Sequence, residues 1–101
     1  MEDRVLRKLF LGFIHIHILH HASEHPIFGQ WMLDELREHG YRMSAGTLYP
    51  ILHSMEHDGL LAKEEQKVAG RTRKYYTTTP KGENILKEAR TKAYELFKEI
   101  N

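Results

Sequence analysis

Apolar residues recur at steps of three and four along most of the chain, a period typical of amphipathic helices. Residues 3–22 carry the longest such run, and the apolar positions cover more than half of the helix circumference. A helix apolar over so much of its surface needs two partners to cover it. We expect the rest of the domain on one side and a second copy of the chain on the other. The alternation in residues 14–18 (IHIHI) also fits a strand, but the helical pattern before it favours a helix.

Two further helices are predicted at about residues 30–39 and 44–58, joined by a short turn that contains Gly40. This arrangement is the helix-turn-helix pattern. Ser44 stands where the second of these helices begins, and we expect its side-chain oxygen to accept a hydrogen bond from a backbone N–H of the first turn. Gly59 stands just past its end, where a left-handed residue is favoured. The buried face of this helix is expected to consist of Leu48, Ile51, Leu52 and Met55.

A β-hairpin is predicted after Gly59. Residues 73–79 (RKYYTTT) are rich in aromatic and β-branched residues, as strands prefer, and Gly70 fits the turn before them. The hairpin tip is expected to carry four basic residues and no acidic one, which concentrates positive charge there. These basic residues are Lys67, Arg71, Arg73 and Lys74.

The last predicted helix spans residues 80–100. It begins with the hydroxyl of Thr79 as a cap and Pro80 at the first helical position, where a missing N–H costs nothing. Its apolar residues form a seam a little over two heptads long, and we expect this seam and the first helix to join two subunits. The expected contact residues are Val5, Leu6, Leu9, Phe10 and Phe13 of the first helix and Leu86, Ala89, Ala93, Leu96, Phe97 and Ile100 of the last.

The fold class that follows is mainly α with a small β-hairpin, in one domain of residues 1–101. Fifteen Lys and Arg against fourteen Asp and Glu give a formal net charge of +1, which excludes a polybasic arm but not a local basic cluster. The chain has no cysteine, which suits a reducing, cytoplasmic location. No signal peptide is recognised, and the longest apolar run is shorter than the ~20 residues of a membrane span.

Enzyme activity is not expected. The chain has no cysteine nucleophile, no Gly-rich phosphate loop and no paired carboxylates in an apolar context. We therefore expect neither a catalytic residue nor a cofactor.

The exposed side of helix 44–58 predicts a contact with double-stranded DNA. The residues expected to make it are Ser44, Thr47, Tyr49 and His53. This set has no carboxylate, and its hydroxyls and imidazole can reach phosphates and base edges. The alternative is that Thr47 and Tyr49 only complete the start of the helix and pack on the hairpin.

The basic hairpin predicts phosphate contacts by Arg71, Arg73 and Lys74. If each neutralises one phosphate, a dimer makes about six contacts, and the logarithm of the binding constant falls with the logarithm of salt with a slope of roughly −5. The alternative is a cluster of solvated charges.

Several segments together resemble the PadR family of bacterial and archaeal transcriptional regulators. They are Gly29 at the start of the second helix, AGTLYPIL (residues 45–52), EHDGL (56–60), RKYY (73–76) and TPKG (79–82). The resemblance covers nearly the whole chain, and the short C-terminal part is similar to the subfamily that ends in a single helix. It differs from common family patterns in Gln30, in Ala45 and in a last helix without tryptophan, on which some members stack planar drugs.

The resemblance implies a winged helix-turn-helix in residues 28–82 and a homodimer formed by helices 3–22 and 80–100. It also implies a sequence-specific DNA-binding regulator, a repressor on a pseudo-palindromic operator that a small-molecule effector or stress signal releases. A winged helix used only for contacts with other proteins is the alternative from a different class.

The eight histidines leave another alternative open. His17 and His21 lie four residues apart, on one helical face, which suits two metal ligands. A metal site would need a third ligand, such as His53, His57 or a carboxylate of the last helix. This reading gives a metal- or pH-responsive regulator, against the simpler one in which the imidazoles line a helix end and bind no metal.

Overall fold

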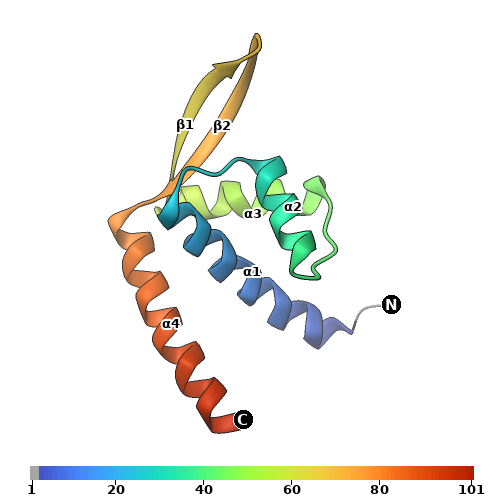
Figure 1. The fold of residues 1–101 in the computed structure, drawn as a ribbon, viewed down its shortest axis with the longest axis vertical. Helices are drawn as coiled ribbons and strands as arrows, with labels where there is room; N and C mark the ends of the chain where they lie inside the picture. The colour runs from blue at the N-terminus through green and yellow to red at the C-terminus, as the bar shows by residue number, and fades with distance from the viewer. Residues whose placement is uncertain (1–2) are drawn as a thin grey trace.

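A computed structural model describes residues 3–101 as four helices and one antiparallel hairpin (Figure 1). The elements are α1 (Arg4–Glu24), α2 (Gly29–Glu38), α3 (Ala45–His57), β1 (Leu61–Val68), β2 (Arg71–Thr78) and α4 (Pro80–Ile100). The predicted fold class is confirmed, and the strand alternative for residues 14–18 is wrong because they lie within α1. Residues 1–2 of the expected domain lie outside the described part.

The core lies where α1, α2, α3 and the base of the hairpin meet. Its residues come from one face of each helix, as the three- and four-residue steps predict. In α3, Leu48, Leu52 and Met55 are buried and Ile51 is half-buried. The remaining helix contributes Leu86, which anchors the first turns of α4 to this core.

The hairpin projects from the helical body (Figure 1). Its turn consists of Ala69 and Gly70, both with positive φ (53° and 77°), which is the type I′ geometry of two-residue hairpin loops. Val68 therefore pairs with Arg71. At its base, Tyr76 exchanges two backbone hydrogen bonds with Ile27, of 2.7 and 2.9 Å, so the hairpin is fixed to the segment that leads into α2.

The end of α3 is joined to the start of α4 by side chains that satisfy free backbone carbonyls. The hydroxyl of Thr79 donates to the carbonyl of Gly59 and accepts from the N–H of Gly82, so the predicted cap is confirmed. Lys81 Nζ donates to the carbonyl of Asp58 at 2.9 Å. Gly59 has the expected left-handed conformation (φ 81°).

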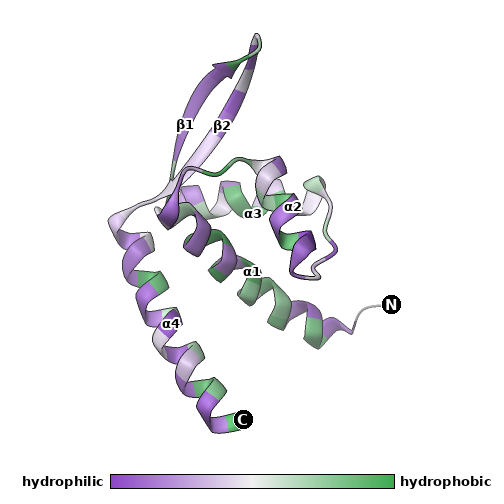
Figure 2. Cartoon of the chain, viewed as in Figure 1, coloured by the Kyte–Doolittle hydropathy of each residue, from purple (hydrophilic) through white to green (hydrophobic). Residues whose placement is uncertain are grey.

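The C-terminal end of α1 lies close to the start of α4. From there the two helices diverge, so that the N-terminus and the C-terminus of the chain lie apart (Figure 1). Figure 2 shows apolar residues continuing along α1 beyond the core. Most residues expected at a subunit contact are exposed in the single chain: Val5, Leu6, Leu9, Phe10, Phe13, Ala93, Leu96, Phe97 and Ile100. Ala89 is half-buried, whereas Leu86 is only 4% exposed. The prediction that Leu86 lies at a subunit contact needs correction, because its side chain is buried in the core of its own chain.

Of the helices in residues 3–101, none combines the length and apolar content needed to span a bilayer.

Candidate nucleic-acid interface

The first turn of α3 presents two hydroxyls side by side. Ser44 occupies the N-cap position, and its carbonyl accepts from the N–H groups of Thr47 and Leu48 at 3.0 Å each. Its side chain makes no capping bond, so that expectation was wrong; Ser44 Oγ lies 3.4 Å from Thr47 Oγ1 instead. Both hydroxyls thus remain able to hydrogen-bond to a partner outside the chain.

One turn further along, the ring of Tyr49 covers the start of α2. Gly29 lies so close to this ring that a Cβ atom there would come within 1.9 Å of Tyr49 Cε1. Tyr49 is nevertheless 49% exposed, so it is both packed on the neighbouring helix and open to solvent. Burial, with smaller contributions from Glu56 and Tyr49, raises the pKa of the nearby Tyr76 hydroxyl, which stays neutral at physiological pH.

The hairpin arginine nearest the helices is held by aromatic rings. The Arg73 guanidinium lies 4.2 Å from the centroid of the Phe28 ring, and Phe28 meets Tyr75 edge-on at 5.6 Å. Such a cation–π contact keeps an exposed guanidinium in one place without neutralising its charge.

The strand register divides the basic residues between the two faces of the hairpin. Arg71 and Arg73 are two residues apart and share a face, while Lys74 lies on the other, directly opposite Glu65. Only Lys67 and Arg71 adjoin the turn region, so the expectation that all four basic residues sit at an acid-free tip was wrong. The two arginines are the basic pair that points to one side.

A cleft of about 680 Å³ separates the exposed side of α3 from the hairpin. Five of the seven predicted DNA contacts line it, namely Tyr49, His53, Arg71, Arg73 and Lys74. Phe28 and Gln30 line it too. None of its lining residues in the described chain is acidic, so the cleft is a positively charged groove with aromatic walls.

Ser44 and Thr47 lie elsewhere, in a smaller cleft of about 340 Å³ between α1 and the turn before α3. Arg7 and Arg42 line this second cleft with them. The sequence reading missed both arginines, and Phe28 and Gln30. Arg42 was recoverable as the one basic residue in the short α2–α3 connection; Phe28 and Gln30 had only their place beside Gly29 as a signal.

Histidines of α1 and of the end of α2 gather where these two helices meet. His17, His21 and His39 each have a ring nitrogen within 4.8 Å of the others. The third member of this group is His39, at the end of α2, and none of the residues that the sequence offered as examples, His53, His57 or a carboxylate of α4, belongs to it. Burial lowers the pKa of His17, and charge on His39 and His21 lowers it further; burial likewise lowers the pKa of His21, against the opposing effect of Glu35.

Known proteins share both this sequence and this fold. A family described as the transcriptional regulator PadR-like family matches residues 18–88. The transcriptional regulator Rv3488 of Mycobacterium tuberculosis is 45% identical over 95 residues, which are 94% of this chain and 89% of that protein.

Solved structures agree. A PadR family transcriptional regulator from Eggerthella lenta superposes with a TM-score of 0.82 at 31% identity, over 95% of this chain and 85% of that one. The PadR-like transcriptional regulator BC4206 of Bacillus cereus superposes with a TM-score of 0.84 at 27% identity, over 93% of each chain.

The matched residues contain the helix-turn-helix and the hairpin, which form the cleft between α3 and the hairpin, and the first turns of α4. The relatives are transcriptional regulators and not enzymes, so the predicted resemblance and the predicted lack of enzyme activity are confirmed. The chain therefore belongs to the PadR-like family of transcriptional regulators.

Proposed function

We propose that the chain represses transcription as a homodimer that binds a pseudo-palindromic operator in cytoplasmic DNA and is controlled by a small effector. The observation that carries the DNA-binding part is the cleft between α3 and the hairpin, with three cations and no carboxylate among its lining residues. A polyanion such as the DNA backbone fits a groove of this charge. A partner protein does not require a groove whose charged lining residues are all positive.

The groove suggests a division of labour along the DNA. α3 enters the major groove, where Thr47, Tyr49 and His53 meet base edges and phosphates, as the second helix of a helix-turn-helix does. Arg71 and Arg73 of β2 bind the phosphates of the DNA strand that lies between α3 and the hairpin. Arg73 is already oriented by Phe28, so less side-chain freedom is lost on binding.

The exposed apolar residues of α1 and α4 support the homodimer. Leu6, Leu9 and Phe13 on α1 and Leu96 and Phe97 on α4 are all between 46% and 59% exposed. Exposed apolar residues on two helices favour contact with another protein, and a second copy offers the same residues by two-fold symmetry. Two copies of α3 then face half-sites about one helical turn, or ~34 Å, apart.

Control by an effector requires that the effector bind the DNA-competent and incompetent states with different affinity. A ligand between the subunits, or where α1 meets α2, would change the separation of the two α3 helices and so the fit to both half-sites.

The test is fluorescence anisotropy with duplex DNA from upstream of the protein's own coding sequence. We expect Arg73→Ala to weaken binding roughly tenfold or more at ~0.1 M salt, because a dimer loses two phosphate contacts. Lys92→Ala removes the same charge from the exposed polar side of α4 and should leave binding unchanged. No binding of the wild-type chain even at low salt would instead support the role as a protein–protein contact module.

A further inference from the structure

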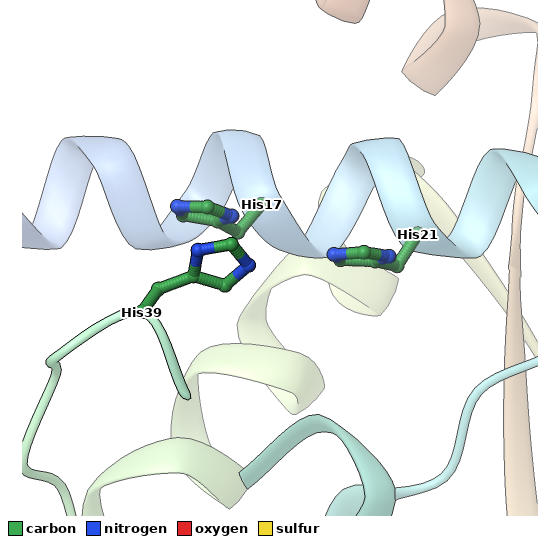
Figure 3. A group of neighbouring side chains, drawn as sticks. All are labelled: His17, His21 and His39. Atoms are coloured by element: carbon green, nitrogen blue, oxygen red, sulfur yellow. The ribbon is translucent and has the colours of Figure 1, made fainter. Parts of the chain in front are cut away.

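Three imidazoles from two helices converge at the junction of α1 and α2 (Figure 3). His17 and His21 stack one turn apart on α1, with ring centroids 6.3 Å apart. His39, which caps the end of α2, approaches His17 to 4.6 Å between centroids. One nitrogen from each ring lies within 4.8 Å of the other two.

A carboxylate completes the group. Glu35 Oε2 lies 3.3 Å from His21 Nε2 and 3.0 Å from His39 Nε2. One oxygen atom of a half-buried residue thus faces nitrogens from both helices. Three imidazole nitrogens and one carboxylate oxygen are a set of donors that Zn²⁺ takes in proteins.

We propose that His17, His21 and His39 bind one Zn²⁺ ion per chain, with Glu35 as the fourth ligand. Tetrahedral zinc with bonds of about 2.0–2.1 Å places its ligand atoms about 3.3 Å apart. The imidazole nitrogens need to close by at most about 1.5 Å from their present separation. His39 is exposed and ends a helix, so its side chain can rotate towards His17 and His21 without disturbing the core.

The surroundings favour the metal-binding form of these groups. Zinc binds neutral imidazole, and burial lowers the pKa of His17 and of His21. Tyr41 and Trp31 meet His17 and His21 edge-on at 5.6 and 5.3 Å, so aromatic rings form the walls beside the ligands. Such walls restrict water around a metal and hold its ligands in orientation.

A neighbouring group, His20, His21 and Glu24, also has three donor atoms within 4.8 Å of one another. All three belong to one exposed helix end, and His20 and Glu24 lie 3.7 Å apart as an ordinary i,i+4 pair. The group with His39 instead joins two elements and offers a fourth donor. Substitution of His20 separates the two sites.

Zinc at this site would connect α1 to the end of α2, directly before residues 40–44, which lead to α3. α1 carries much of the proposed subunit contact. The ion would therefore fix the orientation of α3, the helix proposed to enter the major groove, relative to that contact. This consequence rests on the proposed DNA-binding function, whereas zinc binding itself does not.

Isothermal titration calorimetry of the chelator-stripped full chain with zinc chloride tests the site. We expect one ion per chain for the wild type and an affinity at least about tenfold lower for His39→Ala or His17→Ala. His57→Ala, an exposed histidine on α3, is the matched control, and His20→Ala should behave like it. Substitution of the wild-type ion by Co²⁺ should give the absorption of a tetrahedral nitrogen–oxygen site, and His39→Ala should lose it.

Circular dichroism of each variant shows whether it is folded, and His39→Gln repeats the test at the exposed position with a side chain closer in size. Unchanged zinc affinity in folded His39→Ala, or a larger loss in His20→Ala, would overturn the proposal. Zinc binding that persists while the chain fails to bind DNA would overturn the proposed function and leave the metal site standing.

Discussion

The ring of Tyr49 lies directly against Gly29, with no room for a Cβ atom between them. This contact fixes the exposed side of α3 to the start of α2, next to Phe28, which in turn holds Arg73. One small residue, Gly29, therefore allows α3, α2 and the hairpin to meet around a single cleft.

Gly29→Ala should destabilise the fold. The added methyl must displace the Tyr49 ring, and overpacking of this kind costs roughly 1–3 kcal/mol in the free energy of unfolding. Urea denaturation followed by circular dichroism measures it. Gly12→Ala is the control, since a Cβ at Gly12 meets nothing within 4 Å and should stabilise α1 by about 0.5–1 kcal/mol. Equal effects of the two substitutions would contradict the contact.

Thr79→Val should loosen the joint between α3 and α4. It removes the hydroxyl that donates to the Gly59 carbonyl and accepts from the Gly82 N–H. Loss of a capping side chain typically costs about 0.5–2 kcal/mol, measured in the same denaturation experiment. Thr91→Val is the control, because Thr91 is exposed in mid-helix and donates only to the Lys87 carbonyl; a similar cost there would remove the special role of Thr79.

The helices and the Thr79 cap could be predicted because they depend on neighbours in sequence, whereas the predicted side-chain cap of Ser44 does not form. The three- and four-residue steps placed α1 to α4 within about two residues, and Thr79-Pro80 marked the start of α4. The hairpin register was not readable, since β1 (LAKEEQKV) is exposed on both sides beyond Leu61 and has no alternation to indicate a face. The positive φ values of Ala69 and Gly70 set the register instead.

Long-range packing was also beyond the sequence pattern. The heptad pattern predicts that Leu86 packs against other apolar residues, but it does not indicate whether these belong to the same chain or to another. His39 reaches His17 only because α2 packs back along α1, and no spacing rule predicts that approach. The cleft residues Phe28 and Gln30 were missed for the same reason.

The salt dependence of DNA binding should reflect the two arginines on one hairpin face. Each arginine position occurs twice in a dimer and so accounts for two phosphate contacts. Arg71→Ala and Arg73→Ala should therefore each make the slope of log binding constant against log salt less steep by about 2. Lys74→Ala should change it less, because Lys74 lies opposite Glu65 on the other face. Anisotropy titrations over a range of salt give the slopes, and equal changes for all three would contradict the division by face.

Charge on the exposed apolar surface should dissociate the proposed dimer. Phe97 is 59% exposed and Leu6 48% exposed in the single chain, so Phe97→Asp and Leu6→Asp leave the core intact but place a carboxylate in the subunit contact. Sedimentation at micromolar concentration should show monomers. Lys87→Asp, on an exposed part of α4, is the control. If this variant alone dissociated the dimer, the subunit contact would not be formed by Leu6 and Phe97.

The metal-free protein should lose stability on acidification. The folded state lowers the pKa of His17, chiefly by burial, so the unfolded chain binds more protons below about pH 6.5 and the free energy of unfolding falls as pH decreases. The loss begins near pH 7 and is complete below the lowered pKa. The titratable groups around His17 are His20, His21, Glu35 and His39.

His17→Gln should flatten this pH dependence, measured by urea denaturation in the presence of a chelator at intervals between about pH 5 and 8. His57→Gln should retain it, since His57 is exposed at the end of α3. A profile unchanged by His17→Gln would show that other groups set the acid sensitivity.

The number of chains that bind the upstream duplex can be measured by titration at a duplex concentration well above the dissociation constant. We expect saturation at two chains per operator, with Arg73→Ala weakening the complex roughly tenfold or more at moderate salt and Lys92→Ala preserving it. Saturation at one chain, or a complex indifferent to Arg73→Ala, would contradict the proposed function.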